Sequence, residues 1–555
     1  MTQEISRDER SEPGGAGGRP PAGSTRMMLP GWPGGLAVDG LSAVLLVTLA
    51  VVLAAVLAYS AREGYGPRFF VLMLLFAAAM AVTVTASDLL LLLMGWEVMG
   101  AMSYALIGYA WQDAARVRAA DTAFLTTRAA DLGLYAAAGF AVAGAHSLRL
   151  DALAHADAPW RDLIAAGVVV SALGKSAQLP FSFWLSKAMA GPSPVSALLH
   201  SATMVVAGAY LLMRLHPLLD ATGWASTLVS WAGALTALLM GAVALAQRDL
   251  KQLLAASTCA QIGFMVLAAG AGTVGGGTAH LVAHAAVKSL LFLCAGVWLT
   301  RDGSHRLVDV AFGAGALALA GVPPLALWVT KDEVLAGVGD PALLAVAFAA
   351  SVLSAAYAGK ALLRVLRAVA SSPVALSQRV PLAGLAVAAC GLGALGLPGV
   401  AGEWRRLLGA TGDFTPDVWT LVLSGVLAVV TVGTVVLARR APEPGWALDW
   451  LLLERAATAG VVRPVLALAR ALDRFDDRVV DGAVRGVARA GRGTAALAGR
   501  RVEIRVDGAV GLTARAARWL AALARRPQTG QLHLYYAQAA VVLAVLVAVA
   551  VLAAG

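Results

Sequence analysis

Lysine is scarce in this chain, and the positions of its lysines give the first indication of chemistry. The 555-residue sequence has 43 Lys and Arg residues, of which only six are lysine. Four of the six lie inside or at the edge of strongly apolar segments: Lys175, Lys251, Lys288 and Lys331. An ionisable side chain in hydrocarbon is costly, so it usually marks an ion pathway or a proton relay. Because a buried lysine can lose its proton near neutral pH whereas arginine stays charged, this placement predicts proton transfer.

The densest local pattern is the segment HLVAHAAVKSLLF. His280, His284 and Lys288 are spaced at i, i+4 and i+8, so they lie on one helix face over about 12 Å. A neutral imidazole can accept a proton on one nitrogen while the other donates. The same spacing could hold a metal, but no third ligand is nearby and Lys288 would repel a cation. The pattern favours a proton relay, and no metal site is predicted.

Two of the lysines lie on apolar segments that proline interrupts. Lys175 precedes Pro180 in SALGKSAQLPFSFWL, and Lys331 follows Pro323 and Pro324 in AGVPPLALWVTKDEVL. Proline removes a backbone donor and breaks a helix, and transporters place ion sites at such breaks near the membrane midplane. A proline-interrupted lysine segment in each half of the chain predicts an architecture of internal repeats.

Acidic residues accompany these cations. Glu97 lies in LLLLLMGWEVMG, where a carboxylate must be protonated or paired; the alternative role is a packing ion pair without transport. Arg128 and Asp131 are three residues apart and could neutralise each other on one helix face, either structurally or as part of a relay. Asp332 and Glu333 directly follow the last buried lysine and are predicted to support it as ion-pair partners.

Two further residues are weaker candidates. His200 in SALLHSATM follows the sequence GPSP; alone it would be a satisfied core residue, but beside a broken lysine helix a relay role is favoured. Lys251 in QRDLKQLLAAS lies at a segment edge, where it could extend to the interface, pair with Asp249 or join the relay.

The elements that position these residues are membrane helices. Hydrophobic residues make up 59% of the sequence and charged residues 14%, which excludes an ordinary soluble enzyme. Spans of about 20 apolar residues recur, without the alternation of a β-barrel. The sequence predicts an all-α, polytopic helical bundle with fourteen spans near residues 36–59, 68–86, 88–110, 120–144, 161–185, 194–215, 224–246, 250–272, 278–300, 307–328, 340–369, 381–402, 417–438 and 534–554.

Redox chemistry in this chain is not expected. Cys259, Cys294 and Cys390 occur singly, so they offer no Cys-x-x-Cys ligand set. No Gly-x-Gly-x-x-Gly unit follows a predicted strand, so no dinucleotide site is expected either. We predict no bound cofactor.

Charge indicates how the chain sits in its membrane. The net charge of +10 suits anionic lipids better than nucleic acid. Basic residues concentrate in the loops after the odd-numbered spans, which predicts that these loops face the cytoplasm and the N-terminus lies outside. The expected location is the plasma (inner) membrane.

Taken together, the motifs resemble the antiporter-like L subunit of proton-pumping NADH–quinone oxidoreductase (respiratory complex I). The matching stretches are LLLMGWEVMGAMSYALIGY, GKSAQLPFSFWLSKAMAGPSPVSALLHSATM, DLKQLLAASTCAQIGFM, HLVAHAAVKSLLF and TKDEVL. The resemblance implies a pair between Glu97 and Lys175. It also implies that protons pass toward Lys331 through four residues of a polar axis: His200, His280, His284 and Lys288. NADH, FMN, iron–sulfur clusters and quinone would then belong to partner subunits of a respiratory complex, and this chain would be a translocase subunit.

The expected organisation has five regions. They are a disordered polar tail (1–33), a proton-translocating core (34–335), additional transmembrane helices (336–440), a lateral amphipathic arm (441–530) and a membrane anchor (531–555). A fully helical arm would be on the order of 120 Å long, enough to reach neighbouring subunits, although anionic lipids alone could hold such a helix.

The start of the chain departs from the resemblance. VDGLSAVLLV resembles a region that the family reaches after two earlier helices, which leaves open a divergent paralogue. A subunit of a multisubunit cation/proton antiporter, and a membrane partner of inorganic-carbon uptake or of a hydrogenase, remain alternative functions.

Overall fold

The computed structural model describes residues 26–29, 32–300, 305–365, 374–528 and 530–554. The chain divides into two compact units, Met1–Ala456 and Ala457–Gly555. Most of the predicted polar tail lies outside the described residues. Its last part forms a short antiparallel pair of strands, β1 (Arg26–Leu29) and β2 (Trp32–Gly34).

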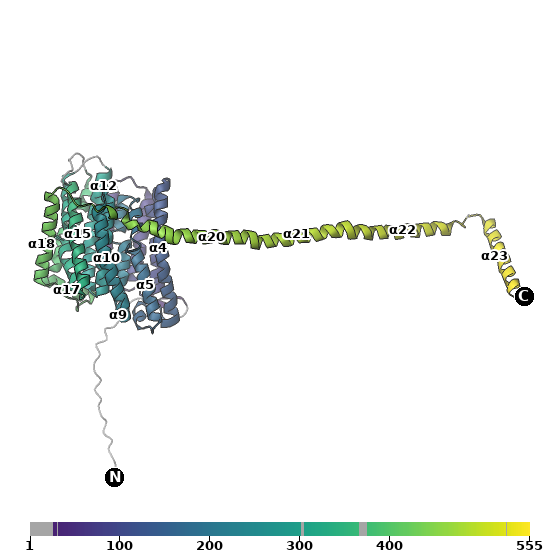
Figure 1. Cartoon of the computed structure of the whole chain (residues 1–555), viewed down its shortest axis with the longest axis horizontal. Helices are drawn as coiled ribbons and strands as arrows, with labels where there is room; N and C mark the ends of the chain where they lie inside the picture. The colour runs from purple at the N-terminus through teal and green to yellow at the C-terminus, as the bar shows by residue number, and fades with distance from the viewer. Residues whose placement is uncertain (1–25, 30–31, 301–304, 366–373, 529, 555) are drawn as a thin grey trace, which may run out of the picture. The chain divides into compact units, whose positions relative to one another are not determined.

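The first unit is a bundle of helices (Figure 1). Its α-helices are α1 (Gly40–Ser60), α2 (Pro67–Thr85), α3 (Leu89–Ile107), α4 (Ala114–Phe140), α5 (Trp160–Lys175), α6 (Phe183–Ala188), α7 (Ser193–Leu199), α8 (Met204–Arg214), α9 (His216–Thr222), α10 (Trp224–Ala246), α11 (Leu250–Ala271), α12 (Val274–Thr300), α13 (Arg306–Ala320), α14 (Ala326–Ala336), α15 (Pro341–Val365), α16 (Leu376–Gly391), α17 (Pro398–Leu408) and α18 (Val418–Leu437). Short helical turns lie at η1 (Ala141–Ala145), η2 (Leu150–His155), η3 (Leu392–Gly396), η4 (Gly445–Ala447) and η5 (Trp450–Leu452), and α19 (Leu453–Ala457) follows.

Within the described ranges, eleven helices are long and apolar enough to cross a membrane. The prediction of a polytopic helical bundle is confirmed. Three of the fourteen predicted spans, near 120–144, 161–185 and 307–328, are not among these eleven helices, for two physical reasons. The α4 helix carries several charged residues, whereas the spans of α5–α6 and α13–α14 are each broken into shorter helices.

The breaks follow from the local sequence. The α5 helix ends at Lys175, and Pro180 lies in the irregular segment before α6. The α13 helix ends before Gly321, which adopts a positive φ of 81°, and Pro323 and Pro324 precede α14. Glycine tolerates that backbone conformation and proline cannot continue a helical hydrogen-bond ladder. A third break, after α7, contains His200.

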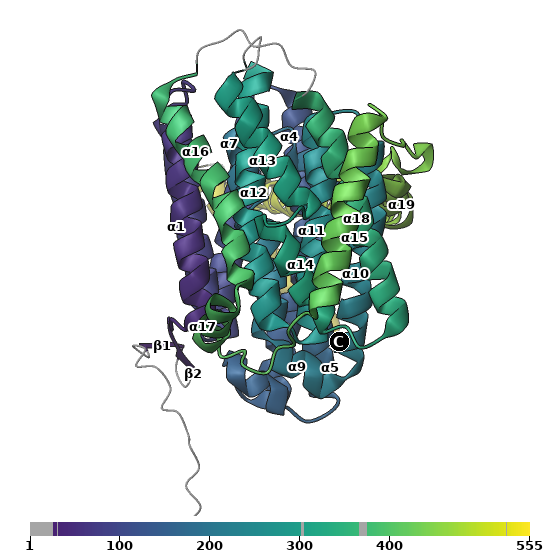
Figure 2. The ribbon, with the colours of Figure 1, turned by 90° about the vertical axis from the view of Figure 1, so that its left-hand side faces the viewer.

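The centre of the bundle is formed by α7–α8, α11 and α12, which are buried almost all round. The α1, α16 and α18 helices lie at its periphery and keep apolar side chains exposed, as expected for a lipid-facing surface (Figure 2). Close helix contact depends on small residues: a Cβ at Gly233 of α10 would lie 2.5 Å from the carbonyl oxygen of Gly263 on α11. The bundle therefore surrounds an inner layer of helices that holds Lys251 and the three candidates of α12, whereas Lys175 and Lys331 lie on α5 and α14.

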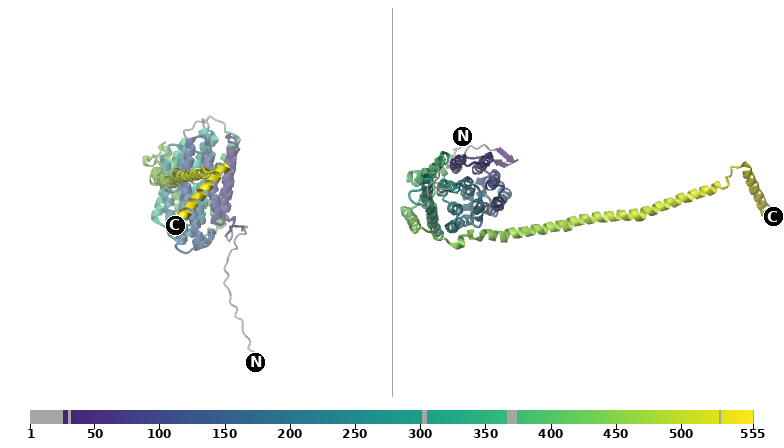
Figure 3. Two further views of the ribbon diagram at one scale, coloured as in Figure 1. Left: turned by 90° about the vertical axis from the view of Figure 1, so that its right-hand side faces the viewer. Right: turned by 90° about the horizontal axis from the view of Figure 1, so that it is seen from above.

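The second unit is helical throughout most of its length. It contains η6 (Thr458–Val462), α20 (Arg463–Phe475), η7 (Asp476–Val480), α21 (Asp481–Leu497), η8 (Ala498–Glu503), α22 (Ile504–Arg525) and α23 (Leu532–Ala553). The η6, η7 and η8 turns are π-helical, so each interrupts the regular α-helical ladder without ending the helix (Figure 3). The α23 helix is the last of the candidate membrane spans.

Candidate functional site

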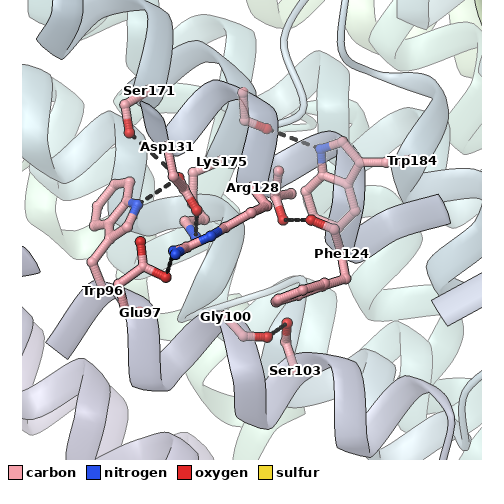
Figure 4. A network of polar contacts seen from close by, with 12 residues as sticks. Trp96, Glu97, Gly100, Ser103, Phe124, Arg128, Asp131, Ser171, Lys175 and Trp184 are labelled. Carbon is pink, nitrogen blue, oxygen red and sulfur yellow. Dashed lines mark hydrogen bonds and ion pairs between the residues drawn. The ribbon is translucent and has the colours of Figure 1, made fainter. Parts of the chain in front are cut away.

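The first polar cluster joins α3, α4 and α5 around a buried ion pair (Figure 4). The Nζ atom of Lys175 lies 2.9 Å from the Oδ2 atom of Asp131, and both side chains are shielded from solvent. Asp131 also accepts hydrogen bonds from Trp96 Nε1 at 2.7 Å and from Ser171 Oγ at 3.4 Å. The Trp96 ring centroid is 4.9 Å from Lys175 Nζ, within cation–π range. A single carboxylate thus receives three donors.

A second ion pair lies beside the first. Arg128 pairs with Glu97, and their side chains are 39% and 24% exposed, respectively. The sequence resemblance implied a Glu97–Lys175 pair, and the spacing allowed Arg128 and Asp131 to neutralise each other. The structure pairs all four residues differently. Because α4 packs against both α3 and α5, two of its charged residues reach different neighbours: Arg128 contacts α3 and Asp131 contacts α5.

His200 lies at the break between α7 and α8 and is fully buried. Its ring centroid is 6.3 Å from that of Trp184 and 6.4 Å from that of Phe292 on α12. Within the described residues, neither ring nitrogen has a hydrogen-bond partner. His200 is therefore a buried titratable group whose two nitrogens are not committed to another protein group.

The three candidates on α12 contact three different elements. Lys288 Nζ donates to the Leu254 carbonyl at 3.1 Å and to the hydroxyl of Ser257, both on α11. His284 Nδ1 lies 3.1 Å from the carbonyl oxygen of Ser201. The remaining candidate, His280, has its Nδ1 atom 3.1 Å from Thr330 Oγ1 on α14. The predicted helix face therefore exists, with all three side chains fully buried.

Lys331 completes the buried series on α14. Its Nζ atom donates to Ser354 Oγ at 2.8 Å and to the Leu319 carbonyl at 3.3 Å. The Phe264 ring connects it to α12, with its centroid 5.9 Å from Lys331 Nζ and 5.9 Å from the His280 ring centroid. A cavity of about 20 Å³ adjoins the ammonium group, enough for about one water molecule.

The acids that follow Lys331 do not pair with it. In the part of the chain that the structure describes, no ion pair joins Asp332 or Glu333 to this lysine; Asp332 instead accepts a hydrogen bond from Ser424 on α18. Residues one or two apart on a helix point in different directions, so adjacency in sequence brought no contact. The expected role of these acids as ion-pair partners is corrected accordingly.

Lys251 is held by backbone oxygens rather than by Asp249. Its Nζ atom donates to the carbonyls of Met189 and Gly191, each at 2.8 Å. Asp249 caps α11 by accepting a hydrogen bond from Gln252 N at 2.9 Å. Lys251, Met189 and Gly191 also line a cavity of about 570 Å³. Lys251 is therefore close to an opening, apart from the buried series.

Sequence reasoning missed the neutral partners. Trp96, Ser257, Thr330 and Ser354 each hold one of the ionisable side chains. A hydroxyl or indole within an apolar helix is a weak signal, since serine and threonine also bond to their own helix backbone. Only the packing of the helices shows which of them face a lysine or histidine.

The chain is similar to known proteins in sequence and in fold. Residues 86–356 match the family described as NADH:quinone oxidoreductase/Mrp antiporter, TM. NAD(P)H-quinone oxidoreductase subunit 5, chloroplastic, of Zygnema circumcarinatum is 37% identical over 338 residues, which cover 54% of this chain and 48% of that protein. NAD(P)H-quinone oxidoreductase chain 5 of Synechocystis sp. is 34% identical over 362 residues, which cover 58% and 53%. The chain spans about half the length of the curated relatives it matches.

Two solved structures resemble the chain. A chain of the Mrp complex from Dietzia sp. DQ12-45-1b has a TM-score of 0.67 and 30% identity, and the match covers 91% of this chain and 58% of that one. A chain of the membrane-bound sulfane sulfur reductase, an archaeal respiratory membrane complex, has a TM-score of 0.61 at 20% identity, with coverage of 74% and 87%; it shares the fold. The predicted resemblance to an antiporter-like subunit 5, or L subunit, of complex I is confirmed by these matches, and the chain is a multi-pass membrane protein that is similar to these subunits.

Proposed function

We propose that the chain is the proton-translocating membrane subunit of an NADH–quinone oxidoreductase. The observation that carries this proposal is the buried series of titratable side chains on α5, α12 and α14: Lys175, His280, His284, Lys288 and Lys331. The relatives named subunit 5 or chain 5 of NAD(P)H-quinone oxidoreductase support the assignment. Electron transfer from NADH to quinone, through FMN and iron–sulfur clusters, belongs to partner subunits in this proposal.

Lys175 is the proposed control point of the relay. Its ammonium is stabilised by Asp131, which in turn is held by Trp96 and Ser171. Arg128, which pairs with Glu97 of α3, lies on the same helix as Asp131, so a change in the charge of either pair changes the field at the other. Quinone reduction in a partner would act on these pairs.

The other residues carry the proton onward. His200 and the two histidines of α12 accept and donate at their ring nitrogens, whereas Lys288 and Lys331 hold a proton between transfers. His280 contacts Thr330, the residue directly before Lys331, and this contact supports transfer from α12 to α14. Lys251, beside the larger cavity, is proposed to exchange protons with the solvent-facing end.

The setting of the relay follows the charge pattern of the loops. We infer a plasma-membrane location. The loops after the odd-numbered predicted spans are rich in basic residues, so we assign them to the cytoplasm and the N-terminus to the outside. Residues 34–335 would form the translocating core, 336–440 would complete the bundle, 441–530 would act as an arm along partner subunits or anionic lipids, and 531–555 would anchor it.

A subunit of a multisubunit cation/proton antiporter is the second candidate. The match to a chain of the Mrp complex favours it, because this match covers more of the chain than the first unit alone contains and so extends into the second unit. The long second unit thus does not by itself distinguish the two functions.

Purification of the native assembly tests both. The tagged chain is solubilised gently from its own host and assayed for NADH–quinone reductase activity. Co-purifying activity that pumps protons in proteoliposomes, and whose pumping is lost on Lys175→Ala, supports the proposal. An assembly without dehydrogenase activity that exchanges Na⁺ for protons would overturn it in favour of the antiporter. The variant Lys187→Ala, at a partly exposed ion pair with Glu454, is the matched control.

A further inference from the structure

A carboxylate at the end of the buried series has no role in the scheme above. Glu333 on α14 is only 7% exposed, yet within the described ranges no hydrogen bond or ion pair engages its carboxylate. Glu333 packs closely on the start of α12: a Cβ at Gly276 would lie 3.0 Å from the Cβ of Glu333 and 3.1 Å from its carbonyl carbon. A buried, unpartnered acid is costly unless its proton can come and go.

A second carboxylate covers the same helix end. Asp413, in the loop between α17 and α18, accepts hydrogen bonds through Oδ2 from Gly275 N at 2.6 Å and Gly276 N at 3.4 Å. Trp404 of α17 donates to the Gly275 carbonyl at 3.0 Å. The α17 helix and the following loop therefore close the end of the bundle at which α12 begins (Figure 2).

The two carboxylates, Glu333 and Asp413, share an electrostatic environment. Arg405 and Asp413 are the charged groups close enough to act on Glu333, while Arg405 and His216 act on Asp413. Partial burial raises the pKa of Asp413 above its ordinary value, and the glycine N–H donors, Arg405 and His216 oppose this rise. A carboxylate whose pKa is raised can hold a proton at a pH closer to neutral.

We propose that Glu333 and Asp413 form the proton-release path at this end of the bundle. A proton released by the buried series is taken up by the Glu333 carboxylate, passes to Asp413, which meets the same stretch of α12 at Gly276, and leaves from there to solvent, and no other bond changes. Burial decreases along this order, from Lys331 at 4% exposed and Glu333 at 7% to the partly exposed Asp413. The inference rests on the proposed function of the buried series.

The test uses the intact assembly in proteoliposomes and three substitutions at one position. Asp413→Asn keeps an oxygen that accepts from Gly275 and Gly276 but cannot exchange a proton, Asp413→Ala removes both functions, and Asp413→Glu restores exchange. Release through Asp413 predicts that Asn and Ala slow translocation about tenfold or more while Glu retains it. The rate should also lose its dependence on the pH of the side that Asp413 faces. Asp417→Asn, in the same loop and without a side-chain cap, is the matched control.

The outcomes separate the inference from the function beneath it. If Asp413→Asn pumps like the wild type and only Ala is impaired, Asp413 is a helix cap and the release path is wrong. Lys331→Met must abolish pumping in the same assay; if it does not, the proposed relay itself fails. Should Asp413→Asn not assemble, Glu333→Gln carries the test, because it retains size and removes the buried step, and unchanged pumping there would overturn the inference.

Discussion

The buried lysines of the two halves of the bundle are held by different chemistry. Lys175 contacts a carboxylate, Asp131, whereas Lys331 contacts a hydroxyl and a carbonyl. A buried ammonium opposite a carboxylate loses its partner if it gives up its proton. A lysine beside Ser354 can be charged or neutral, because a hydroxyl both donates and accepts. The comparison teaches that one lysine is built to stay charged until its neighbourhood changes, and the other to exchange protons.

Asp131→Leu is expected to give the largest loss of stability. It leaves the Lys175 ammonium buried without its counter-ion, which costs about 3–5 kcal/mol of unfolding free energy. Thermal unfolding in detergent measures the effect. The double variant Asp131→Leu with Lys175→Met should recover most of the stability but no pumping. A single variant as stable as the wild type would remove the basis of the comparison.

Trp96→Phe is expected to have the next largest effect. It removes the indole donor to Asp131 while an aromatic ring remains near Lys175. Loss of a hydrogen bond to a charged group costs about 1.5–3 kcal/mol, so the unfolding midpoint should fall by less than in Asp131→Leu. Because the carboxylate is then less firmly held, the pumping rate should also decrease. No change in either measurement would show that Lys175 alone positions Asp131.

Lys331→Met should separate stability from function. Ser354 keeps its hydrogen bonds to the Leu319 carbonyl at 3.0 Å and from Gln261 at 3.0 Å, so its hydroxyl remains satisfied. The expected loss of unfolding free energy is no more than about 1 kcal/mol, while pumping is abolished. A destabilisation as large as that of Asp131→Leu would mean that the two lysines are held alike.

Arg128→Gln should have the smallest effect on stability. Its pair with Glu97 is partly exposed, and pairs of this kind contribute about 0–1 kcal/mol. Coupling is the more sensitive measurement: the ratio of protons moved to quinone reduced should fall while the unfolding midpoint stays nearly unchanged. Glu97→Gln should reproduce this result, and a different response would show that the two residues do not act as one pair.

Sequence alone predicted the class of fold and most of the candidate residues. Fourteen apolar spans and the proline positions indicated a bundle with broken helices, and helical spacing placed His280, His284 and Lys288 on one face. The hydrogen-bond and ion-pair partners of these residues could not be predicted from the sequence, because they depend on which helices are neighbours. The position of α4 between α3 and α5 decides the pairing of Arg128 and Asp131. Likewise, the loop that brings Asp413 onto α12 lies far from it in sequence.

The three attachments of α12 have a mechanical consequence. His280, His284 and Lys288 lie along one face and are fastened to α14, to the break after α7 and to α11, respectively. Rotation of this helix about its axis would disturb all three attachments at once. Motion at any one of the three sites is therefore coupled to motion at the other two. The time course of proton transfer through α12 should show a single phase.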